Sequence, residues 1–251
     1  MCGRFHILSP IAAMADLFGF DERPNMTPAH NIAPTMPVPI VRSRPDGTGR
    51  QLHFARWGFI PSWSKDPMRN PPLINARVET VWEKPSFRHA IARRRCIMPA
   101  DGFWEWQRAI DGNHNKKQAY RIHRSDNTPM AFAAIWEHWM GPDGSAIESV
   151  AMLTCTPNAL VGRIHHRMPV ILEPDQFADW FHHDESRTHK RRVDAMMVPC
   201  DPDRLTLYAV DNRVGNIQHD DPDLLTPINV GQTPNQAGTT TSPSNRQGSL
   251  F

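Results

Sequence analysis

The chain has 251 residues, of which 39% are hydrophobic, so it can bury a sizeable core within one large domain. Its formal net charge is only +2, which excludes a protein that binds nucleic acid through a global excess of basic residues. The composition also argues against secretion and a membrane span, because no signal-peptide pattern opens the chain and no apolar run reaches about 18 residues.

Cysteine and histidine usage indicates a reduced, metal-free protein. The four cysteines show no Cys-x-x-Cys pair or regular spacing, as expected for free thiols in a cytosolic protein. His182, His183 and His189 lie in a polar stretch that lacks metal-ligand spacing. We therefore expect these histidines on a solvated surface, and we expect no metal site.

The first predicted element is a short amphipathic helix. Ser9 is a good N-cap, Pro10 suits the first helical position, and four apolar residues follow at helical spacing. Those residues are Ile11, Met14, Leu17 and Phe18. Residues 20–36 are rich in Pro and Asn and are predicted to form a loop.

Two strands and an exposed loop come next. Residues 37–41 and 52–57 alternate as strands around a turn at 45–47. Residues 61–72 mix Pro, Ser, Lys and Asp, and we expect an exposed loop there that carries Trp63. Ser86 can cap a short helix that ends near Ile91, and a strand follows at 96–98.

The second half predicts more strands than helices. Strands are expected at 118–123, 130–136, 149–155 and 205–210, with turns at 111–112 and 142–144. Helices are expected at 158–164, from Pro174 with a buried stripe of Phe177, Trp180 and Phe181, and at 187–197 in a basic segment. The pattern lacks βαβ alternation, so it predicts an α+β fold.

From residue 231 the composition changes to Gln, Thr, Ser, Asn, Pro and Gly, which cannot bury enough apolar surface to fold. We therefore predict a domain over residues 1–230 and a disordered tail over 231–251. The tail ends in Gln247, Leu250 and Phe251, a pattern similar to the short motif by which bacterial repair and replication proteins dock on the sliding clamp. A chance terminus is the alternative.

The strongest chemical signal is Cys2. Normal trimming of Met1 would leave Cys2 with a free α-amine close to its thiol, and both groups are nucleophiles near neutral pH. The amine can condense with an aldehyde to an imine, and the thiol can then close on the imine carbon to give a thiazolidine. The same thiol could instead attack a peptide carbonyl, as in N-terminal-nucleophile amidohydrolases.

Six blocks in order make the chain resemble the SRAP family (SOS response-associated peptidase), whose members shield abasic DNA. The resemblance spans roughly residues 1–230. The blocks are Met1–Phe5, His30–Thr35, Trp57–Trp63, Ile74–Thr80, Arg95–Trp106 and Ile164–Pro169. It implies a single domain with a twisted, barrel-like mixed β-sheet core flanked by short helices.

The resemblance also implies a catalytic set of Cys2, Asn75, Glu105 and His165. Asn75 would hold the sugar or the thiazolidine, and His165 would act as general acid and base. Glu105 lies among Phe103, Trp104 and Trp106 in the sequence, where desolvation would raise its pKa and suit it to proton transfer. Without the resemblance, a turn residue, an ion-pair partner and a core histidine are the plain alternatives for these three residues.

DNA contacts are expected on the same surface. Arg4, Arg77 and Arg167 match family positions that grip phosphates, and Trp63 is a candidate for stacking on unpaired bases. The chain departs from many relatives at Ser64, where a second aromatic residue is often found, and its loop to Asn75 looks longer. The basic runs 93–95 and 189–192 could extend this surface.

These inferences together predict a monomeric protein of the cytoplasm, associated with the nucleoid, that binds abasic sites in single-stranded DNA. It would form a thiazolidine crosslink through Cys2 without a cofactor or metal and protect the strand from cleavage. The alternatives are a cysteine-type (auto)peptidase that uses the Cys2 thiol, and a non-enzymatic DNA-binding module for which Cys2 is dispensable.

Overall fold

The computed structural model describes residues 2–68, 71–108, 117–184 and 186–229. Its centre is a five-stranded barrel, because β10 pairs with β4 on one side and with β9 on the other and so closes the order β10-β4-β3-β6-β9. The β4–β10 pair is parallel and the other four pairs are antiparallel. The strands are β3 (Pro37–Ser43), β4 (Arg50–Trp57), β6 (Arg95–Ala100), β9 (Met130–Met140) and β10 (Ala146–Cys155).

A second, antiparallel sheet packs beside the barrel in the order β13-β8-β7-β1-β2. Its strands are β1 (Phe5–Ile7), β2 (Ala29–Ile32), β7 (Gly102–Arg108), β8 (Lys117–Arg124) and β13 (Leu205–Val210). Phe5 and Phe103 from this sheet make edge-on contacts with Phe132 of the barrel. Gly102 starts β7 at a point of close approach, since a Cβ there would lie 2.5 Å from His6 Nε2.

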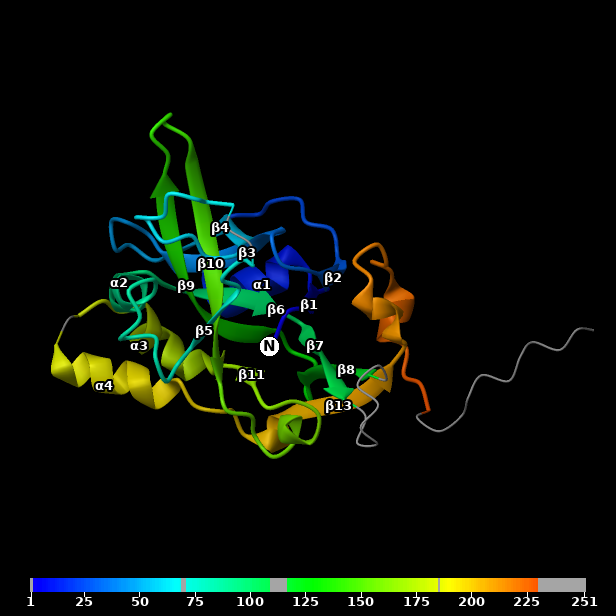
Figure 1. The fold of residues 1–251 in the computed structure, drawn as a ribbon. Helices are drawn as coiled ribbons and strands as arrows, with labels where there is room; N and C mark the ends of the chain where they lie inside the picture. Colours follow the sequence, from blue (N-terminus) through cyan, green and yellow to red (C-terminus); the bar gives the residue numbers. More distant parts are fainter. Residues whose placement is uncertain (1, 69–70, 109–116, 185, 230–251) are drawn as a thin grey trace, which may run out of the picture.

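Short elements surround the two sheets. β5 (Asn75–Arg77) runs parallel to β10, β11 (Met168–Pro169) pairs with the end of β10, and β12 (Ile171–Leu172) pairs with β9. The α-helices are α1 (Ile11–Phe18), α2 (Arg88–Arg93), α3 (Phe177–Phe181) and α4 (Arg187–Met196). In Figure 1, α2, α3 and α4 gather on the left of the barrel, and the label N lies near β5, β7 and β11. No helix in the described part of the chain is long and apolar enough to cross a membrane.

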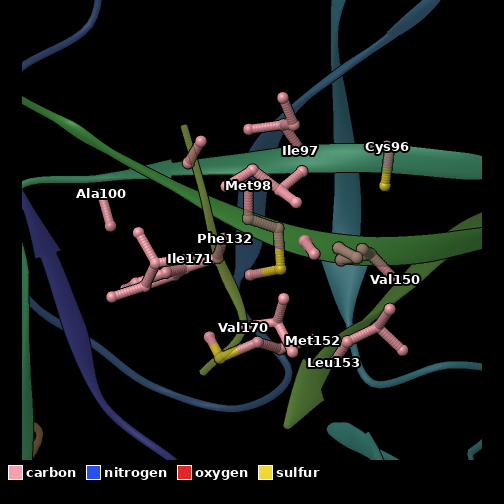
Figure 2. Packing of buried hydrophobic residues seen from close by; sticks show 14 of the residues in the cluster. Cys96, Ile97, Met98, Ala100, Phe132, Val150, Met152, Leu153, Val170 and Ile171 are labelled. Carbon is pink, nitrogen blue, oxygen red and sulfur yellow. The ribbon is translucent and has the colours of Figure 1, made fainter. Parts of the chain in front are cut away.

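The main core is a cluster shared by the barrel and its covering elements, and a smaller second cluster includes Trp104, Ala119 and Val210 of the second sheet. Figure 2 shows side chains from β6, β9, β10 and β12 gathered in it, among them Met98, Phe132, Met152 and Ile171. All six residues of β6 are buried, so its sequence shows no alternation between apolar and polar positions. The closed mixed barrel, the second sheet and the short helices around them confirm the predicted α+β fold with a barrel-like mixed sheet and short flanking helices.

Several predicted elements need correction. Residues 20–36 contain strand β2 and are not all loop. Ser9 does not cap α1, because its hydroxyl binds the Asp101 carboxylate at 2.5 Å and Pro10 takes the N-cap position. Ser86 does not cap α2, whose N-cap is Phe87. The helix predicted over 158–164 is reduced to a 3₁₀ turn, η1 (Val161–Arg163).

His189 is also misassigned in the sequence prediction. It is buried on α4 and contacts the buried Arg95 guanidinium, with 2.9 Å between Nε2 and Nη2, while His182 and His183 are exposed as expected. Because Arg95 donates to the carbonyl oxygens of Ile91 and Trp180, this residue of the basic run 93–95 is not part of an exposed surface. The predicted turn at 111–112 and the tail with Gln247, Leu250 and Phe251 lie outside the described residues.

Candidate functional site

The N-terminal segment brings Cys2 to the edge of the second sheet. β1 runs antiparallel to β7, with Phe5 opposite Phe103, and the Trp104 N–H donates to the Arg4 carbonyl oxygen at 3.0 Å. Because these two strands run in opposite directions, the residues that precede β1 lie beside residues in the later part of β7. This register carries Cys2, which is only 1% exposed, to Glu105.

Asn75 fixes the backbone of Cys2. It opens β5, which is held parallel to β10 with Asn75 opposite Met152. Its side-chain Nδ2 donates to the Cys2 carbonyl oxygen at 2.9 Å. Its Oδ1 is buried without a hydrogen-bond partner. The amide therefore orients Cys2 through one atom and keeps an acceptor available in the site.

Glu105 is the buried carboxyl of the site, with 2% of the residue exposed. Its pKa is raised because burial disfavours the charged form, although a hydrogen bond with the Cys2 side chain acts in the opposite direction. Oε1 lies 3.4 Å from His165 Nδ1 without making a hydrogen bond. Glu105 thus stands between the thiol and the imidazole.

His165 is held by the turn that leads from η1 into β11. Its Nδ1 lies 2.9 Å from the Arg167 carbonyl oxygen and accepts a hydrogen bond from the Arg167 backbone N–H at 3.2 Å. The same carbonyl oxygen lies 3.9 Å from Cys2 Sγ. The peptide group of Arg167 therefore touches both the imidazole and the thiol.

The surroundings of Cys2 disfavour the thiolate form of its side chain. Burial raises its pKa well above the ordinary value, and the neighbouring Glu105 carboxylate raises it further. Thiols that are activated for direct attack have lowered pKa values, caused by a nearby cation, a metal or a helix N-terminus. The Cys2 thiol therefore needs a neighbouring base before it can attack.

The four residues predicted to bind DNA divide into two pairs. Trp63 is 62% exposed on the loop after β4, and Arg77 is exposed at the end of β5. Arg4 and Arg167 instead hold oxygen atoms of the protein itself. The Arg4 guanidinium donates to Asn31 Oδ1 and to the carbonyl oxygens of Val214 and Gly215, at 2.9–3.0 Å.

Arg167 is 8% exposed and forms a two-point ion pair with Glu79, with N–O distances of 2.6 and 3.0 Å. Sequence reasoning gave no role to Glu79 or to Thr154, whose carbonyl oxygen also accepts from Arg167. Glu79 lies in the same block as Asn75 and Arg77, so its place in the sequence was a usable signal.

No group of three or more His, Cys, Asp or Glu residues suited to a metal ion occurs within the described ranges.

The chain is similar to known proteins over most of its length. A protein from Bacteroides thetaiotaomicron has a crystal structure that superposes with a TM-score of 0.79 at 24% identity, covering 90% of this chain and all of the other. The abasic site processing protein YoqW of Bacillus subtilis is 34% identical over 228 residues, which cover 90% of this chain and 99% of YoqW. The abasic site processing protein YedK of Escherichia coli is 30% identical and covers 91% of this chain and all of YedK.

The family model named SOS response associated peptidase (SRAP) matches residues 1–217. This match agrees with the sequence blocks and with the barrel fold. The chain belongs to the SRAP family.

Proposed function

We propose that the protein processes abasic sites in single-stranded DNA by forming a thiazolidine with Cys2 after Met1 has been removed. The names of the relatives support abasic-site processing as the activity. The arrangement of the Cys2 thiol, the Glu105 carboxyl and the His165 imidazole in one buried corner is the observation that carries the crosslinking chemistry. We call Cys2, Asn75, Glu105, His165 and the Arg167 peptide group the reactive corner.

The reaction starts at the C1′ aldehyde of the ring-opened sugar. The Cys2 amine adds to the aldehyde carbon to give a carbinolamine, which loses its hydroxyl group as water and becomes an imine. The Cys2 sulfur then adds to the imine carbon while a proton is delivered to the nitrogen. One water is released, one C–N and one C–S bond are formed, and no oxidant or cofactor is consumed.

Each polar group of the reactive corner has a role in these steps. His165 donates the proton that lets the hydroxyl leave. Glu105 takes the proton from the Cys2 thiol and returns it to the nitrogen, a role suited to a carboxyl whose pKa is raised by burial. Asn75 holds the Cys2 carbonyl oxygen, so the amine and the thiol stay on one fixed Cα.

The protonated thiol supports the order in which the amine acts first. A thiol whose pKa is raised by burial is a weak nucleophile until a base removes its proton, whereas the imine carbon is a reactive electrophile held next to the sulfur. The alternative, a cysteine-type peptidase, would need the same removal of the thiol proton by a neighbouring base before the sulfur attacks a peptide carbonyl.

DNA binding needs no base-specific contact, because only an abasic site offers an aldehyde. Phosphate contacts supply sequence-independent affinity, and we expect two exposed residues to contact the strand, Arg77 at the end of β5 and Trp63 on the loop after β4. Arg4 and Arg167 would have to exchange their protein partners to contact a phosphate.

The test is a denaturing gel of the protein with single-stranded DNA that contains one abasic site. Wild type is expected to give a heat-stable shifted band, and Cys2→Ala no thiazolidine band. Cys2→Ser should leave only an imine that is trapped by borohydride. Mass spectrometry must first confirm that Met1 is absent.

N-terminal acetylation of wild type is the matched control, because it blocks the amine and spares the thiol. Acetylation should abolish the band, because the thiazolidine needs the amine, whereas cleavage of peptide substrates that survives acetylation would support a thiol-based peptidase. No band from wild type with a free Cys2 amine would refute the proposal.

A further inference from the structure

We propose that Trp139 is a positioning residue for DNA binding, because it holds the turn that carries Trp63 and so presents the Trp63 ring for stacking on unpaired bases. This inference rests on the proposed function, in which Trp63 contacts the DNA strand. Trp139 lies on β9, in the hairpin that β9 forms with β10, and Figure 1 shows this hairpin extending beyond the other barrel strands. We call residues 61–64 the Trp63 turn.

Trp63 needs support from the rest of the protein if it is to bind a base well. The residue is 62% exposed, so packing alone does not hold its ring. A side chain that is ordered only on binding loses conformational freedom at that moment, which weakens the affinity, whereas a ring held in place beforehand avoids this loss. The strength of stacking at Trp63 therefore depends on how firmly its turn is held.

The hairpin holds the Trp63 turn at both ends. At the start of the turn, the Ile60 N–H donates to Ser149 Oγ of β10 at 2.9 Å. At its end, the indole N–H of Trp139 donates to the Ser64 carbonyl oxygen at 2.8 Å. Trp63 lies between these two bonds, so the backbone on either side of it is tied to the barrel.

The orientation of Trp139 is itself fixed by the hairpin. Trp139 is buried, although the next residue, Met140, is exposed. Its backbone pairs with Ile147 of β10. Gly141 leaves room for the ring, since a Cβ at position 141 would lie 2.9 Å from Trp139 Cη2, which is closer than carbon atoms in contact approach each other. The indole N–H is therefore presented to Ser64 in one direction.

β10 also connects the Trp63 turn to the reactive corner. Ser149, which holds the start of the turn, comes three residues before Met152, which lies opposite Asn75. A strand rises about 3.3 Å per residue, so these two anchor points are about 10 Å apart along β10. One strand thus sets the spacing between the start of the turn and the residue that holds Cys2. Trp63 is therefore placed to stack on a base near the abasic sugar.

Trp139→Phe tests this role, because it keeps an aromatic ring at the position and removes the N–H donor. Binding of a fluorescein-labelled single-stranded oligonucleotide is measured by fluorescence anisotropy in a Cys2→Ala background, which prevents crosslinking. The dissociation constant should rise about threefold to tenfold, the effect of losing one hydrogen bond that holds the turn. With Cys2 intact, the crosslinking rate at saturating abasic DNA should stay at the wild-type value, because no reacting group moves, and a fall in that rate would contradict the assignment.

A double-mutant cycle separates the positioning of Trp63 from a general effect on the protein. Trp63→Ala should raise the dissociation constant about fivefold or more, because stacking on one base is lost. In the Trp63→Ala background, Trp139→Phe should have no further effect, since no ring is left to position. An equal rise in both backgrounds would overturn the proposal, and so would an unchanged dissociation constant in Trp63→Ala.

Trp136→Phe is the matched control. It makes the same substitution on the same strand three residues earlier, so the side chain lies on the opposite face of β9, where it contacts the Arg42 guanidinium. This variant should leave both the dissociation constant and the crosslinking rate unchanged. A rise in the dissociation constant equal to that of Trp139→Phe would mean that the bond to Ser64 is not the cause.

NMR relaxation of the Trp63 backbone amide and indole N–H in DNA-free protein gives a readout that depends on neither DNA nor crosslinking. The order parameters should fall in Trp139→Phe and stay at the wild-type values in Trp136→Phe. Unchanged order parameters in Trp139→Phe would overturn positioning. A wild type that formed no crosslink would refute the proposed thiazolidine, whereas the positioning role is decided by these order parameters and the dissociation constants.

Discussion

The barrel and the reactive corner differ in the kind of atoms that they bury. Buried apolar side chains such as Ile97, Met98 and Phe132 pack on the two faces of the barrel wall, and the backbone groups of the barrel strands are paired in a closed ladder. In the reactive corner and its Arg167 side chain, Asn75 Oδ1, Glu105 Oε1 and Arg167 Nε are buried without hydrogen-bond partners.

Buried polar atoms without partners cost stability, so native proteins keep few of them. Three of them lie within one small region of the described chain, where a bound ligand could supply their partners. The barrel supplies the free energy that holds these groups in place. The difference predicts that mutations in the two regions will separate stability from chemistry.

The largest effect on stability should come from truncating the barrel. Ile97 is fully buried on β6 and lies opposite Val41 of β3 and Ala133 of β9. Ile97→Ala should lower the free energy of unfolding by about 2–5 kcal/mol, because it removes buried apolar surface and leaves a cavity. Urea unfolding measures this loss, and the crosslinking rate per folded molecule should stay at the wild-type value.

Phe54→Ala is the control for this truncation, since Phe54 is 44% exposed on β4, another strand of the barrel. Its cost should stay within about 1 kcal/mol. A crosslinking rate that fell in Ile97→Ala while the protein remained folded would mean that the barrel and the corner are not separable.

Glu105→Gln should have the opposite profile. The substitution keeps the shape but removes the group that exchanges protons with the Cys2 thiol, so the crosslinking rate should fall by about 10²-fold or more. Stability near neutral pH should be retained or increased, because burying a carboxylate costs more free energy than burying the neutral amide. Single-turnover gels and urea unfolding give the two numbers, and a variant that crosslinks at the wild-type rate would remove Glu105 from the mechanism.

The difference in stability between wild type and Glu105→Gln should depend on pH. Because burial raises the pKa of Glu105 in the folded protein, its protonated form favours folding, fully so below the ordinary carboxyl pKa of the unfolded chain. This contribution is lost as pH rises from about 4 through the raised folded pKa. The stability of wild type relative to Glu105→Gln should therefore fall as pH rises, and a difference that is independent of pH would contradict a raised pKa.

The sequence predicted the barrel better than the elements around the site. Long strands with apolar residues, such as β9 and β10, were predicted from the sequence because many of their positions independently indicate a strand. β1, β5 and β11 are only two or three residues long, and β1 and β5 pair with β7 and β10, which lie more than 70 residues away, so no local pattern marks them. The strand that carries Glu105, β7, was also missed, since its Trp-Glu-Trp run mixes an acidic residue into an aromatic segment.

The site was predicted through the family resemblance, and the structure adds what the resemblance could not. Cys2, Asn75, Glu105 and His165 were named from sequence blocks, and the register of β1 on β7 and of β5 on β10 explains how they meet. The sequence did not separate the exposed Arg77 from Arg4, whose partners at 214 and 215 are distant in the chain. Whether an arginine is exposed depends on the tertiary structure, and the residues next to it in the sequence carry no information on its exposure.

The smallest effects should separate these two arginines. Arg77→Gln should lower the slope of log affinity against log salt by about 0.7, the share of one phosphate contact with single-stranded DNA, and should leave the free energy of unfolding within about 0.5 kcal/mol of wild type. Arg4→Gln should lower the free energy of unfolding by about 1–3 kcal/mol, because the carbonyl oxygens of Val214 and Gly215 lose their donor, and it should leave the salt slope unchanged. Fluorescence titrations of an intact oligonucleotide at several salt concentrations, with Cys2→Ala as the background to prevent crosslinking, measure both slopes. Equal changes in slope would mean that DNA pulls Arg4 away from its protein partners, and the division between exposed and committed cations would then not survive DNA binding.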